Sequence, residues 1–155
     1  MTFTLRQATK TDLDILEHFQ QESANHVKPF DPTIKQEGKI EYYNIPELID
    51  SKNINLIIVE NEDNKVVACG YGEIKDSPKF MKETKFGYIG FMFVLEEFRS
   101  QGIGKLILDE IFKWFKENNI KEITLKVYSE NINAIKRYEK YGFKHLVTTM
   151  HAQIK

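Results

Sequence analysis

The sequence has few of the residues from which metal sites and disulfide frameworks are built. It contains one cysteine and four scattered histidines in 155 residues, so neither a metal site nor an internal disulfide is expected. Cys69 lies in the apolar run Val66–Cys69, which favours a small core residue over a nucleophile. The sequence also lacks an apolar run long enough to cross a membrane, and its first residues do not resemble a signal peptide. We therefore expect a cytoplasmic protein without a metal ion.

Charge of the two signs is nearly balanced. Lys and Arg number 22 against 23 Asp and Glu, and the resulting net charge of −1 provides no field to attract nucleic acid or an anionic membrane. Charged residues make up 29% and hydrophobic residues 41% of the chain, as in globular proteins that bury a core. A chain of 155 residues fits one domain, so residues 1–155 are predicted to fold as a single unit.

One stretch, residues 91–105, combines an apolar strand pattern with a pair of glycines. It predicts a strand ending at Val94, a tight loop, and a helix that starts at the pair Gly102 and Gly104. The amides of residues 103–105 would be among the first of that helix, without a partner inside it and at the positive end of its dipole. Such a helix start predicts an anion site, and phosphate is the anion that it favours.

Two known glycine patterns do not fit this loop. A P-loop requires glycine where the chain has Arg99 and a hydroxyl where it has Leu106. A dinucleotide fingerprint requires a third glycine where the chain has Ile107. A glycine-containing turn without any ligand is the alternative interpretation of the glycine pair taken alone.

Hydrophobic periodicity predicts the remaining elements. A capping box at Thr11 and Asp14 is expected to open the first helix. The polar loop after residue 60 predicts a hairpin, and Asn118–Asn119 are expected to end the helix that follows the glycine pair. The predicted strands are residues 2–8, 54–60, 65–75, 86–94 and 121–128, with two further strands in 143–154, and short helices are predicted at 33–43 and 46–51.

A second motif lies between residues 127 and 143. Asn131 is placed as the cap of a helix, Ala134 and Tyr138 share one face of that helix, and Gly142 ends it. Each feature alone is also what an ordinary amphipathic helix with a cap, an aromatic stripe and a glycine stop would show. The joint spacing of this motif and of Arg99-x-x-Gly102-x-Gly104 resembles the GNAT superfamily, the GCN5-related N-acetyltransferases.

The resemblance implies an α/β fold of the GNAT type. Its central sheet is mixed but mostly antiparallel, with about seven strands flanked by about four helices, and its fourth and fifth strands splay apart. The gap would admit acetyl-CoA, whose pantetheine arm would pair with the backbone of Met92, Phe93 and Val94. An amide of Met92 or Phe93 would polarise the thioester carbonyl. The pyrophosphate would bind residues Arg99, Ser100, Gln101, Gly102, Ile103, Gly104 and Lys105, and Asn131 would add a side-chain hydrogen bond.

The chemistry that the resemblance implies is direct attack of a neutral amine on the thioester. Tyr138 occupies the family's position for the general acid, with a core tyrosine bonded to the backbone as its alternative. The family often places a base on the fourth strand, but residues 86–94 contain no acid. Glu73 on the neighbouring strand is the substitute, with Tyr88 and His145 behind it, and a solvated strand-end charge is the equal alternative for Glu73.

The acceptor is expected to be a small cationic amine, or a lysine or N-terminal amine of a peptide. The segment between Glu22 and Asp50 has six acidic residues against three lysines, a net charge of −3, and would attract a protonated amine unless its carboxylates face solvent away from the site. The rival function is a catalytically silent sensor or scaffold that binds acyl-CoA. The resemblance also makes a homodimer an expectation.

Overall fold

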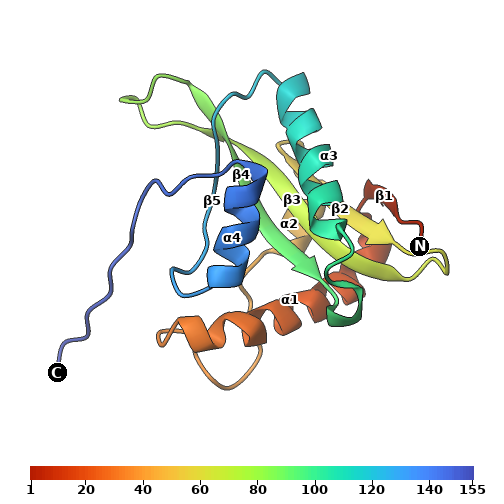
Figure 1. The fold of residues 1–155 in the computed structure, drawn as a ribbon, viewed down its shortest axis with the longest axis horizontal. Helices are drawn as coiled ribbons and strands as arrows, with labels where there is room; N and C mark the ends of the chain where they lie inside the picture. The colour runs from red at the N-terminus through yellow and green to blue at the C-terminus, as the bar shows by residue number, and fades with distance from the viewer.

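The computed structural model describes residues 1–155 as one mixed α/β unit. Five strands form one sheet, and four helices cover it (Figure 1). None of the helices combines the length and apolar character that a membrane crossing requires. The strands are β1 (Thr4–Gln7), β2 (Ile54–Glu60), β3 (Val66–Asp76), β4 (Lys85–Val94) and β5 (Ile123–Leu125), and the helices are α1 (Leu13–Val27), α2 (Ile45–Asp50), α3 (Ile103–Glu117) and α4 (Ile132–Tyr141).

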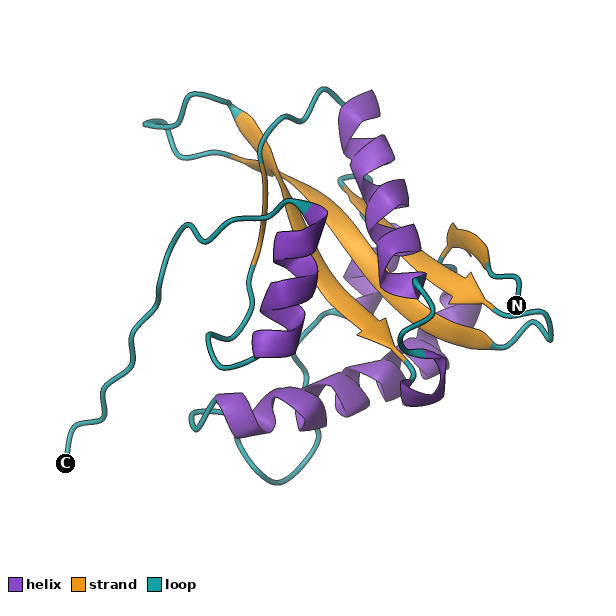
Figure 2. Cartoon of the chain, viewed as in Figure 1, coloured by secondary structure: helices purple, strands orange, loops and turns teal.

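The sheet has the order β1-β2-β3-β4-β5, which is the order of the strands in the sequence (Figure 2). The first four strands pair antiparallel, and β4 pairs with β5 in parallel. Helix α3 connects the two parallel strands, since a parallel pair needs a crossover rather than a tight turn. The expected hairpin and the mixed, mostly antiparallel sheet are confirmed.

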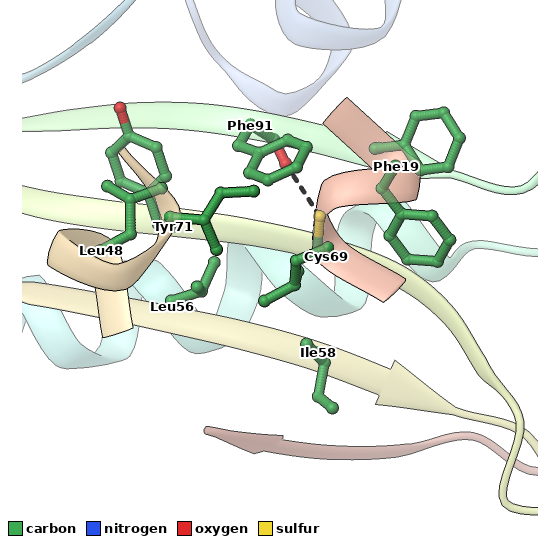
Figure 3. Packing of buried hydrophobic residues seen from close by; sticks show 10 residues of the cluster. Phe19, Leu48, Leu56, Ile58, Cys69, Tyr71 and Phe91 are labelled. Atoms are coloured by element: carbon green, nitrogen blue, oxygen red, sulfur yellow. Dashed lines mark hydrogen bonds between the residues drawn. The ribbon is translucent and has the colours of Figure 1, made fainter. Parts of the chain in front are cut away.

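Two hydrophobic cores lie on opposite faces of this sheet. Helices α1 and α2 cover one face, where Phe19 and Leu48 pack against strand residues such as Leu56 and Cys69 (Figure 3). Helix α3 covers the other face through a stripe that includes Ile107 and the fully buried Phe115. The sheet is therefore fixed on both sides, and its β4–β5 region carries the candidate site.

The capping box lies at Thr9 and Asp12 rather than at Thr11 and Asp14, and it opens a 3-10 turn, Lys10–Asp12, that leads into α1. The Thr9 amide donates to Asp12 Oδ2 at 2.7 Å. Arg6 on β1 holds the same carboxylate with two hydrogen bonds of 2.8 and 2.9 Å. This ion pair, formed between a strand and the following turn, explains why the cap lies two residues earlier.

The prediction of a helix over residues 33–43 is wrong. The short helix predicted at 46–51 is present as α2. Residues 31–44 contain turns and bends with no α-helix. Two α1 side chains satisfy backbone groups that a helix would have paired internally. Gln21 bonds both the amide and the carbonyl of Ile40, at 2.9 and 2.7 Å, and Gln20 accepts from the amide of Tyr43.

The sheet contains five strands and not seven, because the two strands predicted in residues 143–154 are absent. This part of the chain is extended but pairs with no strand, and it leads away from the body of the protein (Figure 1). Strand β5 is also shorter than the predicted 121–128. The apolar residues of the final segment give it a strand pattern, but a strand forms only where an edge is within reach.

Candidate active site

Strand β4 carries a bulge at the centre of the candidate site. Phe91 and Met92 lie together opposite Gly70 on β3, and the register shifts between Cys69 and Tyr71. Phe91 has a φ of 51°, which is rare for an aromatic residue and indicates local strain. Its amide donates a hydrogen bond of 3.1 Å to the hydroxyl of Tyr43, and its carbonyl accepts from the Cys69 thiol (Figure 3).

The sheet opens directly beyond this point. Strand β5 pairs with β4 only from Gly87 to Ile89, so the last five residues of β4 have no β5 partner (Figure 2). The expected separation of the fourth and fifth strands is therefore present. The Leu95 amide donates a hydrogen bond to the Val67 carbonyl on β3. Backbone N–H and C=O groups of successive strand residues point to opposite sides, so those of Val94 and Met92 point toward the open edge.

Not all of the predicted backbone groups are free at that edge. Arg99 Nε donates to the Val94 carbonyl at 3.0 Å, so this oxygen already has a partner. By the same alternation the amide of Phe93 faces β3, which leaves Met92 as the better placed of the two predicted thioester donors. The guanidinium of Arg99 thus ties the loop to the end of β4.

The loop from Ser100 to Lys105 presents a row of unpaired amides. None of these six backbone N–H groups donates to an acceptor in the structure. Ser100 and Gly102 have φ values of 62° and 80°, and Gly102 precedes the first turn of α3. A Cβ added at Gly104 would meet no atom within 4 Å, so the space beside this glycine is open. A row of unpaired amides at a helix start is the geometry that the predicted anion cradle requires.

Three side chains of the loop are engaged with the protein itself. Besides Arg99, Gln101 donates to the Glu97 carbonyl at 3.5 Å, and Lys105 forms a 2.7 Å ion pair with Asp109 one turn along α3. The buried Ile103 side chain anchors the helix start in the core below α3. Backbone amides, rather than these side chains, therefore form the available part of the cradle.

Helix α4 stands beside the gap and begins and ends as predicted. Asn131 is its N-cap, with Oδ1 accepting from the Ala134 amide at 3.3 Å, and Gly142 ends the helix with a φ of 122°. The cap uses the side-chain oxygen of Asn131, so only its NH₂ group is available for the expected bond to a ligand.

Tyr138 projects from α4 and is partly buried, although its hydroxyl has no hydrogen-bond partner in the protein. The ring packs edge-on against Phe143 at a centroid distance of 5.8 Å. Burial raises the pKa of Tyr138, while the charge of Arg137 acts in the opposite direction. A core tyrosine bonded to the backbone was the alternative interpretation, and no such bond is present. The side chain is a phenol that stays protonated at neutral pH and has its donor free.

Glu73 lies directly opposite Tyr88, on the sheet face that α1 and α2 cover. The ammonium of Lys75 is 3.9 Å from Glu73 Oε2 and 5.0 Å from the centre of the Tyr88 ring. Glu73 is thus only partly exposed and pairs with a cation that also lies over an aromatic ring. His145, the third candidate base, is exposed in the final segment and has no hydrogen bond or ion pair with the rest of the chain.

An aromatic cluster that no sequence pattern predicts lies beside the bulge. The Tyr43 ring stacks on Phe91 at 4.6 Å and meets Tyr71 and Tyr42 edge-on. Burial raises the pKa values of Tyr43 and Tyr71. No local signal marks Tyr43, because its partner Phe91 is 48 residues away in the chain. No group of three or more His, Cys, Asp or Glu side chains that could hold a metal ion is present.

The chain is similar in sequence to known acetyltransferases. The sequence model described as "Acetyltransferase (GNAT) family" matches residues 14–143. An N-alpha-acetyltransferase of Saccharolobus solfataricus is 27% identical over 143 residues, which cover 92% of this chain and 80% of that protein. One from Sulfurisphaera tokodaii is 34% identical over 86 residues, 55% of this chain and 50% of that protein. The aligned part of the chain thus spans only half of the Sulfurisphaera relative.

Solved structures share the whole fold at low sequence identity. A mutant form of a Bacillus halodurans protein has a TM-score of 0.89 at 21% identity, covering 98% of this chain and 99% of that one. A Clostridium acetobutylicum protein, described as a predicted acetyltransferase with acetyl-CoA, has a TM-score of 0.76 at 22% identity, covering 98% and 96%. At these identities the likeness shows the fold alone.

Proposed function

The chain belongs to the acetyltransferase (GNAT) family, and from this premise we propose that it transfers the acetyl group of acetyl-CoA to a primary amine by direct attack. The family membership confirms the sequence-based assignment and the expectation of an acetyltransferase. One observation carries the proposed reaction: the amides of residues 100–105 are unpaired where β4 ends and α3 begins, and helix α4, which carries Tyr138, stands beside the same strand (Figure 1). Acetyl-CoA has a pyrophosphate and a thioester sulfur to fill these two places.

Each residue at the gap between β4 and β5 has a separate role in the proposed reaction. The amides of Gln101 to Lys105 hold the pyrophosphate at the start of α3, and the NH₂ group of Asn131 adds a donor. The backbone at Met92 pairs with the pantetheine arm and its amide polarises the thioester carbonyl, as one donor of an oxyanion hole does. Tyr138 donates a hydrogen bond to the departing sulfur, whose conjugate acid has a pKa of about 8.5 if it resembles a free thiol.

The free hydroxyl of Tyr138 also favours turnover over a silent binding protein. A sensor or scaffold needs the phosphate cradle but has no use for a protonated phenol without a partner beside the thioester. A silent binder would bind acetyl-CoA without releasing CoA in the presence of any amine. Release of free CoA in the presence of amines therefore distinguishes an enzyme from a silent binding protein.

We propose a cationic acceptor, because the structure holds an ammonium group on the acceptor side of the sheet. That group is the Lys75 ammonium, between the Glu73 carboxylate and the face of Tyr88. Carboxylates and aromatic faces both attract cations, so an acceptor ammonium could take the same place when Lys75 swings outward. The relatives are named N-alpha-acetyltransferases, and α-amino groups of peptides are also cationic primary amines.

The acidic segment from Glu22 to Asp50 contributes to the same attraction. Glu41 lines a shallow pocket together with Glu17 and Tyr42, next to the aromatic cluster. Lys39 lies 3.8 Å from Glu17 and 3.9 Å from Glu41 and offsets part of their charge. Asp31 does not face this pocket, since it accepts a 2.7 Å hydrogen bond from Tyr128. The remaining field is mildly negative and is screened beyond about 10 Å at 0.1 M salt.

An amine screen with release of free CoA as the readout tests the function. We expect polyamines, aminoglycosides or peptides with free amines to be acetylated with a higher kcat/KM than amino-sugar phosphates. That kcat/KM should fall by about fivefold between low and high ionic strength, because screening weakens attraction of the cation. Preference for anionic amino-sugar phosphates, or no dependence on salt, would contradict a cationic acceptor. No CoA release with any amine would contradict the enzyme itself.

The distance between Glu73 and the bulge in β4 limits the role that Glu73 can have in the reaction. Three residues of strand, at about 3.3 Å each, separate its partner Tyr88 from Phe91, so Glu73 lies about 10 Å from the bulge. That distance is too long for direct proton transfer from an amine at the thioester, and a base at Glu73 would need bridging water. We therefore propose that Glu73 mainly attracts the ammonium form of the acceptor.

Changing Glu73 to glutamine is expected to raise the KM for a cationic amine about threefold to fivefold, with kcat within about twofold of wild type. The estimate follows from the modest energy of a partly exposed ion pair. Asp76→Asn is the matched control, because it removes the same charge from an exposed carboxylate at the far end of β3. A fall in kcat of about 100-fold, with KM unchanged, would instead identify Glu73 as the general base.

A further inference from the structure

One segment, residues 31–43, joins the two sides of the gap between β4 and β5, on the sheet face that α1 and α2 cover. At its end, the Tyr43 hydroxyl accepts a 3.1 Å hydrogen bond from the Phe91 amide of β4, and the two rings stack at 4.6 Å. At its start, Asp31 Oδ2 accepts a 2.7 Å hydrogen bond from the hydroxyl of Tyr128, which follows β5. The segment therefore crosses the gap between these two contacts.

The contact with Tyr128 lies near the level of the proposed chemistry. The parallel pairing of β4 and β5 ends with Ile89 opposite Leu125. Met92 and Tyr128 each follow that last pair by three residues, so they lie at a similar depth in the gap. The segment thus joins the two sides of the gap close to the Met92 amide, the proposed donor to the thioester carbonyl.

The carboxylate of Asp31 is held in place by its own turn. Its Oδ1 accepts hydrogen bonds from the amide and the hydroxyl of Thr33, at 2.9 and 2.6 Å, which leaves Oδ2 for Tyr128. The Phe30 ring lies along the Tyr128 ring at a centroid distance of 6.4 Å. No other hydrogen bond or ion pair joins residues 28–39 to the chain beyond β4. The Asp31–Tyr128 bond is therefore the one polar connection between these two regions.

Helix α4 is held by different partners at its two ends. Its last residue, Tyr141, packs edge-on against Phe112 of α3 at 5.0 Å and donates a 2.7 Å hydrogen bond to Asp109. Its N-cap, Asn131, donates its amide to the Tyr128 carbonyl at 2.9 Å. The start of α4 is therefore held through Tyr128, whereas its end is held through α3.

We propose that Asp31 and Tyr128 are positioning residues for acetyl transfer, which hold the start of α4 at a fixed distance from β4. This inference rests on the proposed function, in which Asn131 and Tyr138 on α4 act across the gap from Met92. The two residues act through α4 and not by touching the substrate. A displacement of about 1 Å in a reacting arrangement can cost about 100-fold in rate, so losing this bond is expected to slow transfer without unfolding the protein.

Changing Tyr128 to phenylalanine removes the bond and keeps the ring beside Phe30. We expect kcat to fall about tenfold, while the dissociation constant of acetyl-CoA stays within about twofold, because the amides at the start of α3 are unaffected. Hydrogen exchange, measured by NMR, should become at least about tenfold faster at the amides of Thr33 and Asn131, which bond within the two joined turns. Circular dichroism should show an unchanged fold.

Tyr141→Phe is the matched control, because it removes the same kind of bond, from a tyrosine hydroxyl to an aspartate at 2.7 Å, at the other end of α4. The ring still packs against Phe112, so kcat and the exchange of the two amides should stay near wild type. A double-mutant cycle adds Asp31→Ala. Because both residues act through their common bond, the double variant should lower kcat no more than the larger single change.

Three results would overturn the proposal. Wild-type kcat in Tyr128→Phe would reduce the bond to a structural one, even if the two amides exchange faster. A lower kcat with unchanged exchange would mean that Tyr128 acts by another route. Effects of Asp31→Ala and Tyr128→Phe that multiply in the double variant would mean that the two residues act separately. Exchange needs no acetyl transfer, so these results are distinct from a wild type that releases no CoA, which would contradict the proposed function itself.

Discussion

Replacing Tyr138 by phenylalanine is expected to lower kcat by about 100-fold to 10,000-fold, the usual effect of losing one general acid. The affinity for acetyl-CoA should stay nearly unchanged, because the ring still packs against Phe143 at 5.8 Å and the hydroxyl has no partner in the protein to lose. Burial raises the pKa of Tyr138, so the wild-type phenol keeps its proton through neutral and moderately alkaline pH. Single-turnover rates and acetyl-CoA titrations measure the two quantities.

Tyr141→Phe is the matched control on the same helix. It also removes one phenolic hydroxyl, but that group donates a 2.7 Å hydrogen bond to Asp109 on the exposed side of α3. We expect its kcat to stay near that of wild type. If Tyr138→Phe keeps kcat within twofold or threefold while chemistry is rate-limiting, Tyr138 is a packing residue and the proton reaches the sulfur from elsewhere.

The features that the sequence predicted well are those encoded by neighbouring residues. The cap at Asn131, the stop at Gly142 and the start of α3 at Gly102 each depend on one residue and the turn beside it. Hydrophobic alternation was equally local, and it placed β2, β3 and β4 within one residue of their observed ends. The loop whose amides stay unpaired, from Ser100 to Lys105, followed from the same local signals.

The features that the sequence did not reveal depend on contacts between distant segments. Tyr43 reaches the Phe91 amide across 48 residues, and Gln21 satisfies Ile40 across 19. Residues 33–43 have a composition that is compatible with a helix. Side chains of α1 instead form hydrogen bonds with backbone groups that such a helix would have paired internally. The segment after Phe143 has strand composition without a strand partner in its own chain. Periodicity specifies what a segment can become, while the available partner decides what it is.

The bulge in β4 explains why the gap has a defined shape. A residue held at a φ of 51°, as Phe91 is, costs about 1 to 3 kcal/mol, and the surrounding contacts must supply it. The stacked ring of Tyr43 and its hydroxyl bonded to the Phe91 amide are such contacts. The bulge turns β4 at the point where β5 has already ended, which leaves Met92 and Val94 at an open edge.

Changing Gly104 to valine is expected to weaken acetyl-CoA binding by at least about tenfold, or 1.4 kcal/mol, while leaving the fold intact. A Cβ at this position would meet no protein atom within 4 Å, so the branched side chain displaces no part of the protein, yet it stands within the loop whose amides, residues 100–105, are unpaired. Unlike Gly102, Gly104 does not have a positive φ, so no backbone strain is added. Valine also has a better helix propensity than glycine. Calorimetry of acetyl-CoA binding measures the loss.

Two comparisons show whether the phosphates are the group that valine displaces. Gly104→Ala adds only one methyl group and should stabilise the helix by up to about 1 kcal/mol, with a smaller loss of affinity than valine. A truncated acetyl thioester without phosphates should react equally well with wild type and Gly104→Val, because it never occupies the cradle. If the folded valine variant binds acetyl-CoA as tightly as wild type, or loses equal activity toward the truncated thioester, the amides at the start of α3 do not hold the pyrophosphate, since steric exclusion acts only on a group that lies in front of them.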